Sequence, residues 1–388
     1  MTNWKQILTT VVHNAEEQFD KLRYQLHERL GKTDEPVIIP YLGYGSPEKL
    51  FIHGRVIQRQ DVLAADDNDT LWRNLLNTYR RLESDEVPHA RIQVEFQDNS
   101  YEVIANEEGF FQQWLRVTQP LTAAKVWHTA SLQLVDAEAN SPVEGSVFIP
   151  SPAAKFGIIS DIDDTVVQTH ATHLLRMART VFLGNARTRL PFPGVAAFYR
   201  ALQAGTAEIP YNPLFYVSSS PWNLYDLLLE FFILQDIPLA PLFLRDWGIS
   251  RSELLPVGHK GHKLLIIQQL LDFYQDLPFI LIGDSGQEDP EIYHHIIQQN
   301  PNRILAAYIR NVTTAPERDT NIGALAQEVA AAGSTLLLDK DTYIMAQHAA
   351  ANGWIAATAL AGIKAAKEKD EAAPGLWEVL LEDETDQI

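Results

Sequence analysis

Residues 156–165 read FGIISDIDDT, an apolar run that ends in a cluster of acidic residues. Four more apolar runs follow, separated by helical stretches: PLFYV (213–217), APLFL (240–244), FILIG (279–283) and RILAAYI (303–309). Short apolar strands that alternate with helices are typical of a parallel sheet covered by helices. The second half of the chain is therefore predicted to be an α/β fold, to which the TLLL run near its end adds one further strand.

Polar residues stand directly after three of these runs. They are Asp161 and Asp163 after FGIIS, Ser218, Ser219 and Ser220 after PLFYV, and Asp284 and Asp289 after FILIG. In an open α/β sheet the ligand crevice lies at the carboxyl ends of the strands, so these segments are expected to converge. Lys263 begins the apolar helix that precedes the FILIG strand, which places its ammonium group near the same edge.

This set of residues suits the transfer of a phosphoryl group. Asp161, Asp284 and a main-chain oxygen form an all-oxygen set of the kind that binds Mg²⁺. Two carboxylates repel a phosphate, and Mg²⁺ together with Lys263 offsets that repulsion. One Asp then attacks phosphorus, and a second Asp donates a proton to the leaving oxygen and later activates water. Ser218 and nearby N–H groups hold the phosphate oxygens.

Each motif taken alone has an ordinary explanation. A D-x-D-x-T motif occurs in surface acidic turns, Ser220-Pro221 resembles the start of an amphipathic helix, and a single Lys at a helix start is usually solvated. All the elements nevertheless occur in order, each at the expected end of a strand or helix, which favours a catalytic site. A zinc site on His259 and His262 is an alternative, for which the sequence offers no evident third ligand.

The same segments resemble two nested groups of enzymes. DIDDT, the Ser after PLFYV, Lys263 and GDSGQED look like the four signatures of the haloacid dehalogenase superfamily of phosphotransferases. SDIDDTV, YVSSSPWNLYDLLLEFF, LRDWG, GHKGHK and FILIGDSGQEDPEIY resemble the catalytic domain of the actin-patch family of phosphatidate phosphatases. This resemblance spans roughly residues 151–315. It implies a Rossmann-like (haloacid dehalogenase-like) sheet with a small helical cap inserted at about 166–212.

The resemblance also implies roles for individual residues. The expected catalytic residues are Asp161 as nucleophile, Asp163 as acid and base, and Ser218 and Lys263 as the phosphate-binding pair. The expected substrate contacts are Thr165, Ser219, Ser220 and His262. The expected Mg²⁺ site comprises Asp161, Asp163, Asp284 and Asp289, of which Asp289 has a supporting role.

The rest of the chain is predicted to form further parts around a phosphatase domain at 151–345. Residues 1–36 are expected to contain an amphipathic helix. Residues 37–150 show short alternating runs typical of an antiparallel β-sandwich, with a helical insert at about 70–86. Residues 346–388 are expected to form a C-terminal helix and a solvated acidic tail.

The composition limits the classes of function. The 388 residues include 50 acidic and 31 basic side chains, which gives a formal net charge of −19. This excess argues against broad binding to nucleic acid and leaves at most peripheral contact with an anionic membrane. The chain contains no Cys, which excludes disulfides, thiolate zinc sites and a Cys nucleophile. No signal peptide or transmembrane segment is recognised, which predicts a cytoplasmic protein.

The leading hypothesis is a Mg²⁺-dependent phosphatidate phosphatase that acts through an aspartyl-phosphate intermediate and releases diacylglycerol and phosphate. One alternative keeps the chemistry but takes a soluble phosphate ester. The cap sequence suits either substrate, since it mixes apolar residues with Arg176, Arg179, Arg187 and Arg189. A further alternative is a non-catalytic scaffold with a relic phosphatase domain, against which the intact Asp161 and Asp163 argue.

Overall fold

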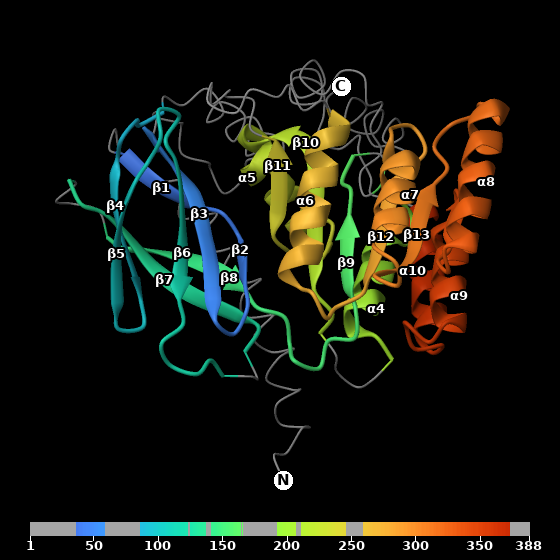
Figure 1. Cartoon of the computed structure of the whole chain (residues 1–388), viewed down its shortest axis with the longest axis horizontal. Coiled ribbons are helices and arrows are strands. Elements are labelled where there is room, and N and C mark those ends of the chain that lie inside the picture. The colour runs from blue at the N-terminus through green and yellow to red at the C-terminus, as the bar shows by residue number, and fades with distance from the viewer. Residues whose placement is uncertain are drawn as a thin grey trace, which may run out of the picture.

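The computed structural model describes residues 36–58, 86–122, 125–136, 141–163, 165, 192–206, 211–245 and 259–372. They form a β-region within residues 36–150 and an α/β-region within residues 151–372, which lie side by side (Figure 1). The predicted N-terminal helix, the helical insert at about 70–86, the part of the cap before residue 192 with its four arginines, and the acidic tail after residue 372 lie outside the described residues.

The β-region consists of short strands, as the alternating sequence predicts. Its strands are β1 (Pro36–Pro40), β2 (Gly43–Gly45), β3 (Lys49–Gln58), β4 (Arg91–Phe96), β5 (Asn99–Ile104), β6 (Phe110–Arg116), β7 (Trp127–Leu134) and β8 (Val143–Phe148). They pair in the order β1-β3-β2-β8-β7-β4-β5, and β6 pairs with β3. The described strands thus join in a single hydrogen-bonded sheet, and the β-sandwich stays a prediction. All pairs are antiparallel except β2 with β8.

The α/β-region is built on a parallel sheet of six strands. They are β9 (Gly157–Ser160), β10 (Leu214–Pro221), β11 (Leu242–Arg245), β12 (Phe279–Asp284), β13 (Ile304–Arg310) and β14 (Leu336–Asp339). The order β11-β10-β9-β12-β13-β14 is that of a doubly wound fold, because the chain first moves outward from β9 and then returns to its other side. The Rossmann-like parallel sheet is therefore observed, and its switch point lies between β9 and β12.

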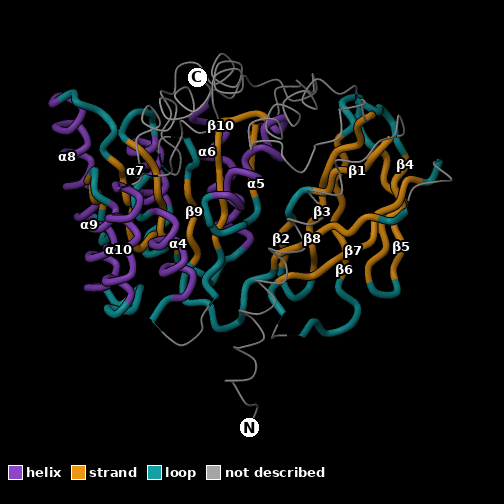
Figure 2. The backbone as a smooth tube through the Cα atoms, turned by 180° about the vertical axis from the view of Figure 1, so that it is seen from behind, coloured by secondary structure: helices purple, strands orange, loops and turns teal. Residues whose placement is uncertain are grey.

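Helices cover both faces of this sheet (Figure 2). One face packs against α4 (Val195–Ala204), α5 (Tyr225–Leu234), α9 (Thr342–Ala351) and α10 (Ala359–Ala372). The other face packs against α6 (His259–Phe273), α7 (Asp289–Gln299) and α8 (Pro316–Ala331). The apolar strands are buried on both sides because their side chains alternate between the two layers. On β12, for example, Ile282 faces the first layer and Leu281 the second.

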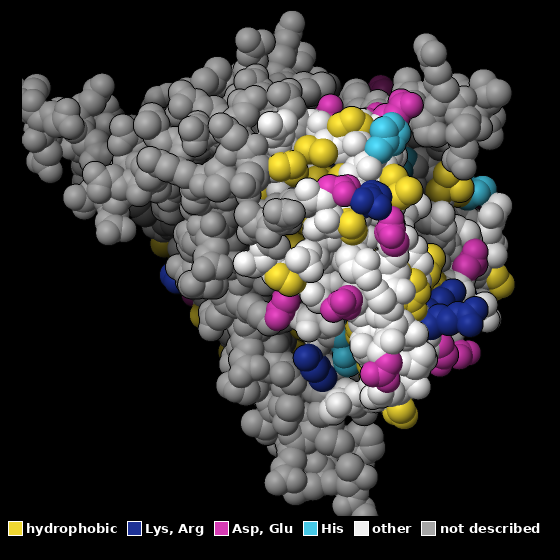
Figure 3. Space-filling model, turned by 90° about the vertical axis from the view of Figure 1, so that its left-hand side faces the viewer, with side chains coloured by type: hydrophobic (Ala, Val, Ile, Leu, Met, Phe, Trp, Pro, Cys, Tyr) yellow, Lys and Arg dark blue, Asp and Glu magenta, His cyan; other side chains and the backbone are white. Residues whose placement is uncertain are grey.

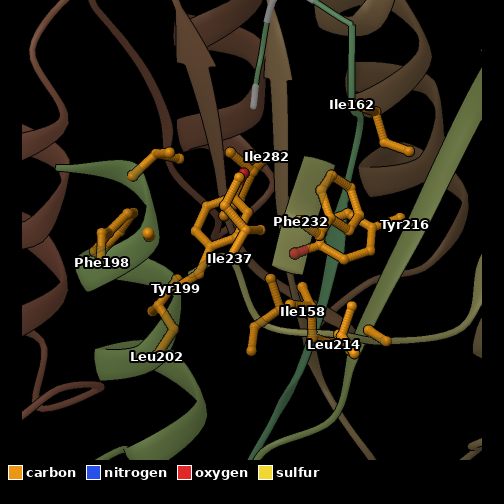
Figure 4. Close-up of a cluster of buried hydrophobic side chains, with 14 of the residues drawn as sticks. Ile158, Ile162, Phe198, Tyr199, Leu202, Leu214, Tyr216, Phe232, Ile237 and Ile282 are labelled. Carbon is orange, nitrogen blue, oxygen red and sulfur yellow. The ribbon is translucent and has the colours of Figure 1, made fainter. Parts of the chain in front are cut away.

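The predicted ranges of the cap and of the phosphatase domain include or divide helices that pack on the sheet. The cap was expected to extend to about residue 212, but α4 places Phe198, Tyr199 and Leu202 against the sheet (Figure 4), so this helix belongs to a covering layer. The phosphatase domain was expected to end at residue 345, which falls inside α9. The buried Ala346, Ala349 and Ile363 show that α9 and α10 pack in the same layer.

The described helices include none that is long and apolar enough to span a membrane.

An aromatic interface joins the two regions. Tyr41, between β1 and β2, stacks on Trp222 of the α/β-region with ring centroids 4.5 Å apart and planes inclined by 13°. Tyr44 of β2 packs against Phe243 and Phe273, with ring centroids 5.3 and 5.4 Å away. Contacts of this kind stabilise an interface through buried area and ring geometry together. The outer face of the β-region, in contrast, carries interspersed acidic and basic side chains (Figure 3).

His53 makes the stability of this interface dependent on pH. Its ring meets Trp222 edge-on at 5.3 Å, and Nε2 contacts the Leu42 carbonyl at 3.3 Å. Burial lowers the pKa of His53 from 6.5 to about 4, although the hydrogen bond opposes this shift. Below pH 6.5 the unfolded chain therefore takes up a proton that the folded chain does not. The free energy of unfolding should fall as the pH drops through this window, by at most about 3 kcal/mol from this residue.

We predict that His53→Gln reduces this pH dependence, because glutamine keeps a hydrogen-bond donor but does not titrate. Urea unfolding of the wild type and the variant between about pH 7.5 and pH 4.5 measures the difference. Other buried histidines contribute to both curves and cancel in the comparison. An equal loss of stability in the two proteins would contradict the assignment to His53.

Candidate active site

Asp161 lies at the centre of the parallel sheet, directly after β9. Its main-chain N–H donates to the Ile282 carbonyl of β12 at 2.9 Å, so the residue sits at the switch point between the two strands. The side chain is only 1% exposed. An apolar strand that is buried on both faces thus delivers a carboxylate to the position where doubly wound folds bind ligands.

Lys263 connects Asp161 to a second carboxylate. Its Nζ lies 2.9 Å from Asp161 Oδ1 and 2.6 Å from Asp289 Oδ1. Helix α6 begins at His259, one turn before the predicted start, which places Lys263 in its second turn. Burial alone would lower the pKa of Lys263, but the two carboxylates outweigh burial and raise it. The ammonium group therefore stays charged in a site that is closed to solvent.

Asp284 ends β12 and presents its two carboxylate oxygens differently. Oδ1 accepts the N–H groups of Gly286 and Gln287 at 2.6 and 3.0 Å. Oδ2 is buried and has no hydrogen-bond partner among the described residues. The Asp284 N–H donates to Asp289 Oδ2 at 3.2 Å. Gly283 makes this packing possible, since a Cβ atom there would lie 2.4 Å from Asp289 Oδ2.

The three carboxylates form a cluster suited to a hard divalent cation. One oxygen from each of Asp161, Asp284 and Asp289 lies within 4.8 Å of the others. Both oxygens of Asp289 already have partners, so Asp161 and the unpartnered Asp284 Oδ2 are the better direct ligands. Burial, followed by the charge on Asp289, raises the pKa of Asp284 to about 7. Burial also raises the pKa of Asp161, against the effect of Lys263. A single ammonium group thus leaves excess negative charge, which a bound cation would neutralise.

Asp163 lies outside this cluster and is held by the serines that follow β10. Its Oδ2 accepts the Ser218 and Ser220 hydroxyl groups at 2.8 and 2.9 Å. The Ser220 N–H donates to Ser218 Oγ at 2.9 Å. Both serines belong to β10, so Ser220 does not cap a helix. Two hydroxyl donors on one carboxylate oxygen fix the orientation of the Asp163 side chain.

The remaining predicted site residues are Thr165, Ser219 and His262. Thr165 Oγ1 lies 3.4 Å from Asp161 Oδ2 and thus contacts the carboxylate itself. Ser219 Oγ is buried without a hydrogen-bond partner among the described residues, whereas the Ser218 hydroxyl is donated to Asp163. Ser219 lies between Ser218 and Ser220 on β10, so the alternation of side chains along the strand directs it away from Asp163. His262 precedes Lys263 on α6, and no described histidine belongs to a cluster of metal-binding side chains.

Arg318 supports the loop beside Asp284 and was not among the residues predicted from the sequence. Its guanidinium group donates to the carbonyls of Ser285 and Gln287 at 2.9 and 2.6 Å, and it pairs with the Glu291 carboxylate. These bonds fix the loop whose N–H groups hold Asp284 Oδ1. Arg318 comes from the start of α8, in a segment without a recognisable motif, so only the folded structure connects it with Asp284.

Part of the α/β-region is similar in sequence to a family of known enzymes. Residues 156–311 match the family described as "Phosphatidate phosphatase APP1, catalytic domain". This segment is similar to that catalytic-domain family. Phosphatidate phosphatase APP1 of Saccharomyces cerevisiae is 33% identical over 171 residues, which cover 43% of this chain and 28% of the yeast protein. The predicted resemblance to the actin-patch type is confirmed for this segment.

A second relative and one solved structure give weaker similarities. An uncharacterized protein of Schizosaccharomyces pombe is 31% identical over 158 residues, which cover 40% of this chain and 25% of that protein. The chain thus matches only about a quarter of the length of these curated relatives. Among solved structures, a carbohydrate acetylesterase from Xanthomonas citri matches 76% of both chains at 11% identity, with a TM-score of 0.26. That similarity is too low to support any statement about function.

We predict that Arg318→Ala loosens the loop around Asp284. The variant loses the bonds to two carbonyls and one carboxylate, so amide hydrogen exchange in a peptide covering residues 284–290 should accelerate by about tenfold or more. Arg303→Ala is a matched control, because the Arg303 guanidinium likewise donates to main-chain carbonyls, those of Leu271, Tyr274 and Leu277 at the end of α6. This control should accelerate exchange near residues 271–278 instead. Unchanged exchange over 284–290 in Arg318→Ala would contradict the role of Arg318.

Proposed function

We propose that this chain is a Mg²⁺-dependent phosphatidate phosphatase of the haloacid dehalogenase-like type, which releases diacylglycerol and phosphate through an aspartyl-phosphate on Asp161. One observation carries the proposal. The buried Asp161 carboxylate meets the Lys263 ammonium at 2.9 Å, at the switch point of a segment that matches a phosphatidate phosphatase catalytic domain. A buried carboxylate beside a fixed cation is suited to attack a phosphoester that the cation holds.

The residues present fit a bound Mg²⁺. Asp161, Asp284 and the main-chain carbonyl of Asp163 would hold the ion, and Asp289 would orient Asp284 through its main-chain N–H. When bound, Mg²⁺ supplies the positive charge that offsets the repulsion between the carboxylates and the phosphate. The all-oxygen donor set matches the preference of this cation, and water and phosphate oxygens would complete its shell.

Asp161 performs the first half-reaction in this proposal. A carboxylate oxygen of Asp161 forms a bond to phosphorus while the bond between phosphorus and the diacylglycerol oxygen breaks. Lys263 holds a phosphate oxygen and limits the negative charge that builds up during transfer. The burial of the pair keeps competing water away, and Thr165 beside Asp161 Oδ2 limits rotation of the carboxyl group.

Asp163 moves the protons. It gives a proton to the departing diacylglycerol oxygen, which leaves a carboxylate that the Ser218 and Ser220 hydroxyls stabilise. In the second half-reaction the same carboxylate takes a proton from water, and the resulting hydroxide attacks phosphorus and releases Asp161.

We predict that Asp161→Asn abolishes phosphate release. An amide is a poor nucleophile and a weaker metal ligand, so both functions of the residue are lost together. Activity of the wild type should also disappear with a chelator and return when Mg²⁺ is added. Asp272→Asn is the control, since Asp272 is an exposed aspartate that accepts a hydrogen bond from Gln268 on its own helix, and it should keep full activity.

The assay compares phosphatidate in mixed micelles with soluble phosphate esters. Faster release from phosphatidate supports the proposed substrate, whereas faster release from a soluble ester would favour a phosphatase of small molecules with the same chemistry. If the folded wild type released phosphate from no ester, the result would favour a non-catalytic scaffold with a relic phosphatase domain. Normal release by a folded Asp161→Asn variant would contradict the covalent mechanism.

We predict that Asp163→Asn lowers kcat most for substrates with poor leaving groups. A lost general acid should slow release from an alkyl phosphate by a factor on the order of 10² to 10⁴, while an aryl phosphate with a good leaving group loses less in the first half-reaction. Measuring kcat for both esters, with Asp272→Asn as the control, gives the ratio. Equal losses for the two esters would contradict the role of Asp163 as an acid.

A further inference from the structure

The β-region contacts the segment that carries the serines of the site. Tyr41 is 4% exposed and stacks on Trp222 with ring centroids 4.5 Å apart. It also packs on Tyr225, at 4.3 Å and 47°. The Leu42 N–H donates to the Tyr225 hydroxyl at 2.7 Å. Two consecutive residues of the β-region thus hold two residues of the α/β-region that lie one turn apart.

The held residues follow the serines of the site almost directly. Ser220 is bound to Asp163, Pro221 comes next, and Trp222 begins a short 3-10 turn. Pro221 has a backbone φ of −72°, which its ring restricts. Pro221 thus removes one backbone rotation between Ser220 and Trp222, which links the positions of these two residues. The placement of the hydroxyl groups on Asp163 therefore depends on where Trp222 is held.

We propose that Tyr41 is a positioning residue of the active site, which acts through Trp222 on the contact of Ser218 and Ser220 with Asp163. This inference rests on the proposed function, because it assigns the effect to the proton transfer that Asp163 performs. It gives the β-region a part in catalysis: without the Tyr41 ring, the serine segment shifts and Asp163 loses its orientation toward the leaving oxygen.

Tyr44 distinguishes this role from simple docking of the two regions. Tyr44 belongs to the same aromatic interface and packs on Phe243 and Phe273, which lie on β11 and at the end of α6. None of its ring contacts among the described residues reaches the segment from Ser218 to Tyr225. Removing either ring weakens the interface, but of the two only the Tyr41 ring stacks on Trp222, whose other ring contact in the β-region is the edge of His53.

The experiment compares Tyr41→Leu with Tyr44→Leu in the full chain. The kcat is measured for an alkyl phosphate and for an aryl phosphate with a good leaving group, and thermal unfolding reports the loss of stability. Tyr41→Leu should lower kcat for the alkyl ester about tenfold more than for the aryl ester. Tyr44→Leu should change both values by the same factor. Tyr41→Phe keeps the stacked ring and should restore the wild-type ratio between the two esters.

Each outcome decides the inference. Equal losses for the two esters in Tyr41→Leu, or the same ratio in Tyr44→Leu, would overturn it while the proposed function stands. If Tyr41→Leu does not fold, Trp222→Leu removes the stack from the other side and must give the same preferential loss for the alkyl ester. If the wild type releases phosphate from neither ester, the proposed function fails and the inference fails with it.

Discussion

The buried pairing of Lys263 with Asp161 and Asp289 is the interaction on which the site depends. It joins three elements that are far apart in sequence: the end of β9, helix α6 and the start of α7. A buried ammonium between two carboxylates is tolerated only when geometry and hydrogen bonding are good, because each ion has lost its water. The position of Asp284 follows from the same arrangement, since Asp289 also accepts the Asp284 N–H. A displacement of any of these elements therefore changes the distances between Lys263 and the carboxylates on the others.

The doubly wound sheet explains why these groups meet. Its order places β9 beside both β10 and β12, so the acidic residues after β9, the serines of β10 and the end of β12 share one edge. The fold also separates two tasks. Asp161, Asp284 and Asp289 gather around Lys263, while Asp163 is held apart by Ser218 and Ser220. This separation suits a reaction in which one carboxylate bonds to phosphorus and another moves protons.

Much of this arrangement could be predicted from the sequence, because apolar runs that end in polar residues specify both the strands and the edge where the polar groups meet. The convergence of Asp161, Lys263, Asp284 and Asp289 follows from that pattern. Arg318 could not be predicted, since its partners are main-chain carbonyls that carry no sequence signal. The stack of Tyr41 on Trp222 was equally hidden, because it depends on how two separate regions pack. The early end of the predicted phosphatase domain has a similar cause: an Ala-rich helix does not reveal from its sequence which layer it joins.

Trapping the covalent intermediate tests the central claim most directly. Wild-type chain is mixed with ³²P-labelled phosphatidate and Mg²⁺, quenched in acid within milliseconds, reduced with borohydride, digested and mapped by mass spectrometry. The account predicts that Asp161 is the modified residue, which borohydride converts to homoserine in a substrate-dependent manner. Modification at Ser218, or phosphate release during which no residue is modified, would contradict Asp161 as the nucleophile.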